Sequence, residues 1–189
     1  MKKNDNLEFQ PIISSEMIYD GKIIKVRKDQ VRLPDGSIAM REIVTHYGGV
    51  CILVVDGDYT YIVRQFRNPS GKVLVELPAG KLEKDEDPTA AAIREVSEEV
   101  GLNALSIHSL GKVHSSPGFC SEVIYLYYCD EFEKGSQHLD EDEYLRYEKI
   151  TLKDFEKMVL SGEIEDAKTL AVYLRYKLLK EQQNAKKNN

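Results

Sequence analysis

Hydrophobic and polar residues alternate with a period of two along much of the first half of the chain, which is typical of half-buried β-strands. Two such runs, KIIKVRKDQVRL and SIAMREIVTHY, flank the turn signal PDG and predict an antiparallel hairpin. The next run, GGVCILVVDGDYTYIVRQFR, repeats the pattern around DGD, and VLVELPAG reads as a strand that ends at Pro78 and Gly80. The order predicts a series of antiparallel pairs.

The period changes to that of a helix after these strands. Apolar residues recur there at spacings of three and four and predict one buried helix face: Ala92, Ile93, Val96 and Val100. Asp87 is a suitable N-cap, Pro88 fits the first helical position, and Gly101 is placed to end the helix. These signals together predict a helix over about 88–100.

The remainder alternates again before it closes with helices. SLGKVH and EVIYLYYCDEF predict strands joined by a loop at SSPGF, and DEDEYLRYEKI predicts an acidic loop that enters another strand. Two helices are expected at the end, one in TLKDFEKMVLSG capped by Thr151 and one from about Asp166 through Lys180. The polar segment 181–189 is expected to be disordered.

Composition narrows the class of protein. A chain of 189 residues suits one domain with a small appended lobe, and a net charge of −6 without a long basic block argues against a nucleic-acid surface. Three cysteines without a CxxC pair indicate reduced thiols, and no apolar run is long enough to span a bilayer. We expect a cytoplasmic protein.

Three glutamates share one side of the predicted helix: Glu95, Glu98 and Glu99. Two carboxylates about 5 Å apart repel by roughly 3 kcal/mol at an effective dielectric near 20, so a positive partner is expected. Arg94 lies four residues before Glu98 and can hold it, but a divalent cation with oxygen ligands can neutralise more of this charge. The alternative is a solvated acidic face with salt bridges.

The spacing favours the metal interpretation. GKLEKDEDPTAAAIREVSEEVGL, from Gly80 to Leu102, resembles the Nudix box GX5EX7REUXEEXGU at every specified position, where U is aliphatic. The resemblance implies an α+β fold, a Nudix-type α/β/α sandwich with a mixed sheet, preceded by a small antiparallel N-terminal lobe. It divides the chain into a lobe over 1–45, a Nudix hydrolase domain over 46–180 and a tail over 181–189.

The same resemblance assigns roles within the box. It implies Glu95 and Glu99 as the principal ligands of Mg²⁺, with Mn²⁺ as a possible substitute and two or three ions expected per site, and Glu98 as contributing to metal binding and catalysis. Ala79, just before the box, would offer its backbone carbonyl to a metal. Four further positions are structural in the motif: Gly80, Glu86, Arg94 and Gly101.

The flanking sequence resembles the ADP-ribose pyrophosphatase branch of the family. VELPAG enters the box directly, Pro117 lies fifteen residues beyond Leu102, and RQFR and MREIVTH match the branch pattern. This implies hydrolysis of ADP-ribose to AMP and ribose 5-phosphate, with substrate contacts from four residues: Arg41, Arg67, Glu76 and Pro117. Either arginine could instead form a surface ion pair.

Two other functions remain open at this point. A pyrophosphatase for another nucleotide sugar, such as GDP-mannose, would use the same metal site. A regulator that binds ADP-ribose without cleaving it is a different class, and the complete set of box glutamates and the lack of an appended basic helix-turn-helix segment argue against it.

The branch also implies a base and an assembly. Its catalytic glutamate usually lies in the loop that here reads LDEDEYLRY, which places the candidate bases at Glu141 and Glu143, with Asp140 and Asp142 as neighbouring alternatives. A solvated acidic loop is the simpler interpretation of the same residues. The N-terminal lobe of this branch crosses to a second subunit, so we expect a homodimer with composite active sites.

Overall fold

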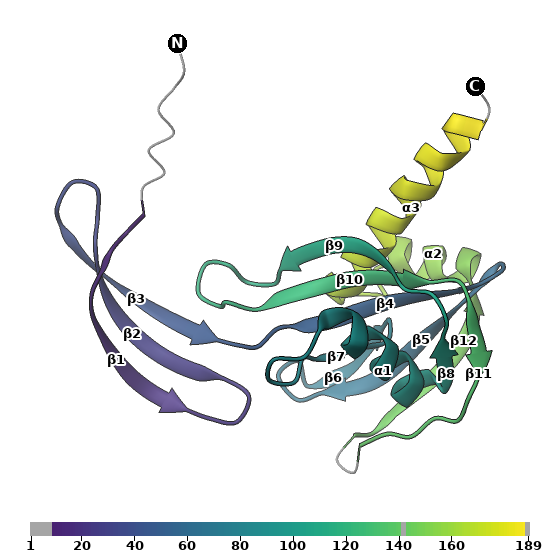
Figure 1. The fold of residues 1–189 in the computed structure, drawn as a ribbon, viewed down its shortest axis with the longest axis horizontal. Helices are drawn as coiled ribbons and strands as arrows, with labels where there is room; N and C mark the ends of the chain where they lie inside the picture. Colours follow the sequence, from purple (N-terminus) through teal and green to yellow (C-terminus); the bar gives the residue numbers. More distant parts are fainter. Residues whose placement is uncertain (1–8, 141–142, 188–189) are drawn as a thin grey trace. The chain divides into compact units, whose positions relative to one another are not determined.

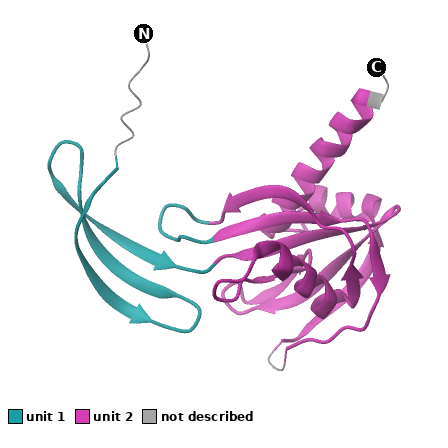
Figure 2. Cartoon of the chain, viewed as in Figure 1, with its two compact units in different colours: residues 1–47, 116–122 teal, residues 48–115, 123–189 magenta. Residues whose placement is uncertain are grey.

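The computed structural model describes residues 9–140 and 143–187. The chain divides into two compact units, residues 1–47 with 116–122 and residues 48–115 with 123–189 (Figure 2). Each unit has its own sheet, and the two are described in turn.

The first unit is a three-stranded antiparallel sheet in the order β1-β2-β3 (Figure 1): β1 (Ile12–Asp20), β2 (Lys25–Arg32) and β3 (Ile38–Thr45). The predicted hairpin is confirmed as β2 and β3, with Arg32 opposite Ile38 at the turn. Strand β1 was missed, because all nine of its residues are exposed and show no clean alternation. The segment 116–122 joins this unit through Val44, which donates its N–H to the Phe119 carbonyl over 2.7 Å.

The second unit is built on a seven-stranded mixed sheet. Its main order is β12-β5-β4-β10-β9, with β6 on β5 and β7 on β4. Strand β10 runs parallel to β4 and the other pairs are antiparallel. The strands are β4 (Gly49–Asp56), β5 (Tyr59–Arg67), β6 (Lys72–Glu76), β7 (Ala79–Lys81), β9 (His108–His114), β10 (Val123–Cys129) and β12 (Leu145–Thr151).

The remaining elements of this unit are three helices and a short ribbon. The helices are α1 (Pro88–Val100), α2 (Leu152–Ser161) and α3 (Ala167–Lys187). The ribbon pairs β8 (Leu102–Ala104) with β11 (Phe132–Lys134), and its three-residue strands are too short to show a period in the sequence.

Strand β4 is buried on both faces and forms the middle layer. Val50, Ile52 and Val54 belong to a core cluster with the apolar side of α1. Cys51 and Leu53, which point the other way, belong to a second cluster with Phe155 of α2 and Val172 of α3. Because successive strand residues face opposite sides, helices cover both faces, and the expected α/β/α sandwich is confirmed.

Helix α1 begins and ends where the sequence predicts. The Asp87 side chain accepts hydrogen bonds from the N–H groups of Thr89 and Ala90, and Gly101 ends the helix with φ 66. The expected apolar face is wrong at Ile93, which is 41% exposed, whereas Ala91 is fully buried. The buried face of α1 is rotated relative to the expected one, because it also includes Glu95 and Glu99.

Helix α3 extends beyond its expected end. It continues to Lys187, so seven residues of the expected disordered tail, 181–187, are helical. The reason is local: Glu181, Gln182, Gln183, Ala185 and Lys186 are mostly good helix formers that prolong the helix while remaining exposed.

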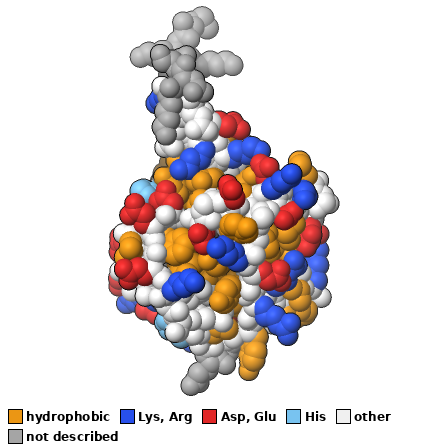
Figure 3. Space-filling view, turned by 90° about the vertical axis from the view of Figure 1, so that its right-hand side faces the viewer, with side chains coloured by type: hydrophobic (Ala, Val, Ile, Leu, Met, Phe, Trp, Pro, Cys, Tyr) orange, Lys and Arg blue, Asp and Glu red, His pale blue; other side chains and the backbone are white. Residues whose placement is uncertain are grey.

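Acidic and basic side chains are interspersed with hydrophobic ones on the face shown in Figure 3. Over residues 9–140 and 143–187, no helix is long and apolar enough to cross a membrane. The three cysteines are free thiols, two buried and one partly exposed.

Candidate active site

The carboxylates of α1 lie against the short strand β7. Glu99 is 1% exposed and accepts a hydrogen bond from the Ala79 N–H at 2.8 Å. Glu95 is 6% exposed and lies so close to Gly80 that a Cβ added there would be 1.8 Å from Glu95 Oε1. Two of the three acids are therefore buried beneath β7, and a side chain at position 80 would displace the Glu95 carboxylate from its present position.

Arg94 binds three acids of the box, Glu86, Glu95 and Glu98. Its Nε and Nη2 donate to the two oxygens of Glu86 at 3.0 and 3.1 Å. Its Nη1 donates to Glu95 Oε1 and to Glu98 Oε2, both at 2.8 Å, so the expected contact with Glu98 is present. The Arg94 guanidinium lowers the pKa of Glu86. One arginine thus fixes three carboxylates and leaves Glu99 without a cationic partner in hydrogen-bond contact within the described residues.

Burial raises the pKa of both inward-facing acids. It raises the pKa of Glu95 to about 7 even though Arg94 opposes it, and it raises that of Glu99 well above the ordinary value even though the Ala79 N–H opposes it. Repulsion from Glu98 and Glu143 adds to the effect at Glu95, and repulsion from Glu95 and Glu143 adds to it at Glu99. Arg94 compensates Glu95 only in part, Glu99 has no cation in hydrogen-bond contact among the described residues, and these carboxylate oxygens suit a hard divalent cation. In the described ranges, no three His, Cys, Asp or Glu side chains already converge as metal ligands.

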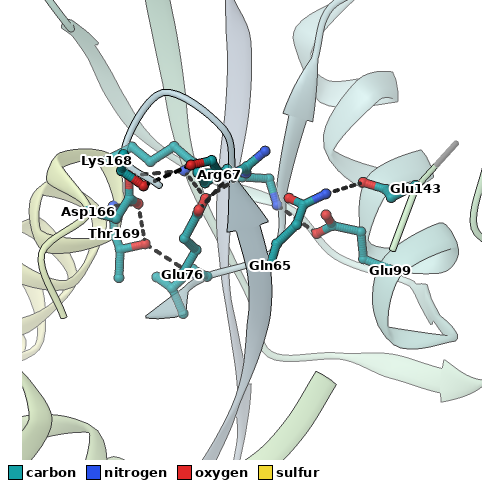
Figure 4. Close-up of polar contacts among 11 residues, drawn as sticks. Gln65, Arg67, Glu76, Glu99, Glu143, Asp166, Lys168 and Thr169 are labelled. Carbon is teal, nitrogen blue, oxygen red and sulfur yellow. Dashed lines mark hydrogen bonds and ion pairs between the residues drawn. The ribbon is translucent and has the colours of Figure 1, made fainter. Parts of the chain in front are cut away.

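A fourth carboxylate comes from the loop before β12. Gln65 of β5 donates to Glu143 Oε1 at 3.4 Å (Figure 4). Burial first, and then the neighbouring Asp140, raise the pKa of Glu143. The other candidate base, Glu141, and its neighbour Asp142 lie outside the described residues.

Arg67 and Glu76, expected to contact substrate, form a bidentate ion pair. Arg67 Nε and Nη2 each donate to one oxygen of Glu76 at 2.7 Å. Glu76 is 1% exposed and is also bonded by Lys168. Both Glu76 oxygens are engaged, which favours a role in orienting Arg67 over the expected contact with a ribose hydroxyl.

Sequence reasoning missed the partners of this pair. Lys168, Asp166 and Thr169 lie about 90 positions after Glu76, and no motif links the two segments (Figure 4). The helix-start signal at Asp166 could have indicated where α3 begins, but not that this helix start lies beside Glu76. Gln65 lies two positions before Arg67 on the same strand, and this spacing could have indicated that both face the same side.

Two further expected substrate residues belong to the first unit. Arg41 of β3 donates to Gln10 Oε1 at 3.1 Å and to the Met40 carbonyl at 3.0 Å. Pro117 lies in the segment 116–122. Their contact with substrate stays a prediction.

Comparison with known proteins shows similarity over most of the chain. Residues 45–173 match the NUDIX domain, and residues 12–44 match the nucleoside diphosphate sugar hydrolase N-terminal domain. The chain is 40% identical to an ADP-ribose pyrophosphatase of Bacillus subtilis (strain 168), covering 93% of this chain and 96% of the relative. It is 37% identical to a methanol dehydrogenase activator of Bacillus methanolicus, covering 89% and 92%.

A solved structure described as an ADP compounds hydrolase has the same fold, with a TM-score of 0.83 at 18% identity over 94% of this chain and 97% of that one. The box on α1 and β7, the domain match and the relatives agree, and this chain belongs to the Nudix family.

Proposed function

We propose that this Nudix protein hydrolyses the diphosphate of ADP-ribose to AMP and ribose 5-phosphate. The observation that carries the proposal is the set of buried carboxylates on α1, facing Glu143, in a chain 40% identical to an ADP-ribose pyrophosphatase over nearly its whole length. The substrate class of nucleoside diphosphate sugars agrees with the match of residues 12–44.

Nudix hydrolases generally use divalent metal ions. Here we propose Mg²⁺, with Mn²⁺ as a substitute, at two or three ions per site. Glu95 and Glu99 would hold them, with help from Glu98 and the Ala79 carbonyl. When bound, such ions polarise phosphoryl oxygens and lower the pKa of coordinated water.

The chain's own residues supply the other roles. Glu143 would accept a proton at its carboxylate, since its raised pKa brings it closer to the range in which a base works at neutral pH. Gln65 would orient that carboxylate. Arg67, held by Glu76, would bind a phosphate oxygen of the substrate, and Arg41 and Pro117 would add contacts from the N-terminal unit.

A hydrolysis screen tests the substrate. The protein would be incubated with Mg²⁺ and a set of nucleoside diphosphate derivatives that includes ADP-ribose and GDP-mannose, and the products would be identified by mass spectrometry. Preferred cleavage of ADP-ribose to AMP and ribose 5-phosphate supports the proposal. Preferred cleavage of GDP-mannose assigns a different nucleotide sugar to the same metal site, and tight ADP-ribose binding without cleavage indicates a regulator.

We also propose a cytoplasmic homodimer with two composite sites. Free thiols suit a reducing compartment, and the first unit carries exposed apolar side chains that a second subunit could cover, among them Ile12, Met17, Ile18 and Met40. Light scattering at micromolar concentration tests the dimer. Activity regained on mixing Arg41→Ala with Glu99→Gln chains tests whether Arg41 serves the neighbouring site, whereas a fully active monomer rules this out.

A second candidate function is activation of a dehydrogenase. It is favoured by the relative named methanol dehydrogenase activator, which matches 89% of this chain. The rate of a methanol dehydrogenase would be measured with and without this protein. A parallel assay with Glu99→Gln would show whether any activation requires the carboxylate site.

A further inference from the structure

Lys168 is a largely buried cation at the start of α3. Its side chain is 16% exposed, it bonds Glu76 Oε2, and it lies 3.0 Å from Asp166 Oδ1. Burial by itself lowers the pKa of Lys168, but the surrounding acidic groups outweigh this and the pKa is raised. Lys168 therefore keeps its charge inside the protein.

Glu76 connects this buried cation to Arg67. A carboxylate with 1% exposure needs close positive partners to stay ionised, and Glu76 has two, Arg67 and Lys168, which both contact its Oε2 (Figure 4). Arg67 is 37% exposed, and its third nitrogen, Nη1, has no hydrogen-bond partner in the part of the chain that the structure describes. Glu76 thus holds the Nε and Nη2 edge of the Arg67 guanidinium, and Nη1 remains available as a donor.

The charges of this network balance. Arg67 and Lys168 carry two positive charges, and Glu76 and Asp166 carry two negative ones. Without Lys168, the same network would carry one net negative charge, and Glu76 would draw on Arg67 alone. An anion approaching Arg67 would then meet repulsion in place of a neutral background.

The first turn of α3 is also tied to the strand segment that leads into the carboxylate site. Thr169 Oγ1 accepts a hydrogen bond from the Leu77 N–H at 2.9 Å and donates to Asp166 Oδ2 at 2.6 Å. Two residues further on, Ala79 binds Glu99. Lys168 is thus fixed to the same short segment, residues 76–79, that contacts both Arg67 and the box.

We propose that Lys168 is a positioning residue, which acts through Glu76 to set the orientation and effective charge of Arg67 toward the diphosphate of the substrate. The inference rests on the proposed role of Arg67 in binding that diphosphate. It adds a requirement of its own: Lys168 matters for anion binding only while Arg67 is present.

The test measures binding of inorganic pyrophosphate by calorimetry and, separately, the kcat and KM for ADP-ribose. Lys168→Met is expected to weaken pyrophosphate binding about tenfold and to raise KM by a similar factor, while kcat changes less than about twofold. In an Arg67→Ala background the same substitution is expected to have no further effect on binding. Lys177→Met is the matched control, because Lys177 lies on the same helix and also pairs with a glutamate, Glu156, but is 49% exposed.

Asp166→Asn gives a test of opposite sign. Asparagine can still cap α3, but the network gains one positive charge, so pyrophosphate binding is expected to strengthen a few fold. This variant also keeps the inference testable if Lys168→Met fails to fold.

Several results would overturn the inference: unchanged affinity in Lys168→Met, an equal loss with and without Arg67, weaker binding in Asp166→Asn, or no measurable pyrophosphate binding by the wild-type protein. Wild-type protein that binds pyrophosphate but does not hydrolyse ADP-ribose would instead overturn the proposed substrate, and the binding series would still decide the role of Lys168.

Discussion

The backbone N–H of Ala79 donates to Glu99 Oε2 across 2.8 Å and ties strand β7 to the buried side of helix α1. Sequence comparison with the Nudix box draws attention to the Ala79 carbonyl, whereas the structure shows a role for its N–H. The bond holds a carboxylate whose burial is otherwise unfavourable. A neutral amide at position 99 could keep the same hydrogen bond, so the effect of the charge can be tested apart from the effect of the geometry.

Glu99→Gln is expected to retain the fold and lose activity. The amide oxygen can still accept from the Ala79 N–H, but the charge that we propose binds the metal is removed, so kcat should fall by at least about 10²-fold. Circular dichroism and steady-state kinetics with Mg²⁺ measure the two effects. Glu133→Gln, an exposed substitution on β11, is the control. Near-normal turnover in a folded Glu99→Gln protein would show that the metal assignment is wrong.

Gly80→Ala should disturb metal binding more than folding. The new Cβ would lie 1.8 Å from Glu95 Oε1, and the end of that side chain must move away. We expect the free energy of unfolding to change by about 1 kcal/mol or less, while the Mg²⁺ concentration for half-maximal rate rises at least about tenfold. Gly135→Ala is the control, because the atoms nearest to its new Cβ belong to the side chain of Asn103, at 3.2 Å or more. An unchanged Mg²⁺ requirement would remove Glu95 from the site.

The parts of the site that local sequence determines were predictable. A helix places residues three and four apart on one side, so the grouping of Glu95, Glu98 and Glu99 followed from spacing, as did the caps at Asp87 and Gly101. Burial was harder to foresee: neighbouring apolar positions differ by 100° around a helix, and the pattern could not tell that Ala91 faces the core and Ile93 does not.

Long-range contacts were not predictable from one sequence. Glu76 and Lys168 are 92 positions apart, and their contact depends on how α3 packs on the sheet. Any acid on β6 and any lysine at a helix start would show the same local pattern. Neither the pairing of Glu76 nor the role proposed for Lys168 could therefore be predicted without the fold.

Glu143→Gln is expected to lower kcat about 10²-fold or more while KM changes less than about threefold, because a general base acts in the transition state. Glu141→Gln would be measured beside it, since Glu141 is the other candidate and lies outside the described residues. The contact of Glu143 with Gln65 and its raised pKa support its candidacy. If neither substitution changes kcat, the base lies elsewhere.

The Glu76 network should add an acid-sensitive contribution to stability. Burial alone raises the pKa of Glu76, but Arg67 and Lys168 outweigh it and the pKa lies below its ordinary value. The contribution is therefore fully present above the unfolded pKa, about 4.3, and is lost as the pH falls through the folded pKa.

Urea unfolding between about pH 3 and pH 6 measures this slope. The slope is expected to be smaller in Glu76→Gln than in the wild-type protein. Glu165→Gln, which removes an exposed partner of Lys72, should keep the wild-type slope. Equal slopes in wild type and Glu76→Gln would contradict the assignment of a lowered pKa to Glu76.

Thr169→Val should destabilise the second unit, because it removes both hydrogen bonds of the Thr169 hydroxyl, one from the Leu77 N–H and one to Asp166 Oδ2. The Leu77 N–H donates to Thr169 Oγ1 at 2.9 Å, and Thr169 is fully buried. Valine has the same shape but no acceptor, so the buried donor is left unsatisfied at a cost of about 1–3 kcal/mol. Thr169→Ser keeps the hydroxyl and is the matched control. Denaturant unfolding compares the three proteins. A Thr169→Val protein as stable as Thr169→Ser would mean that this bond does not anchor α3, and Lys168 would then need another means of staying beside Glu76.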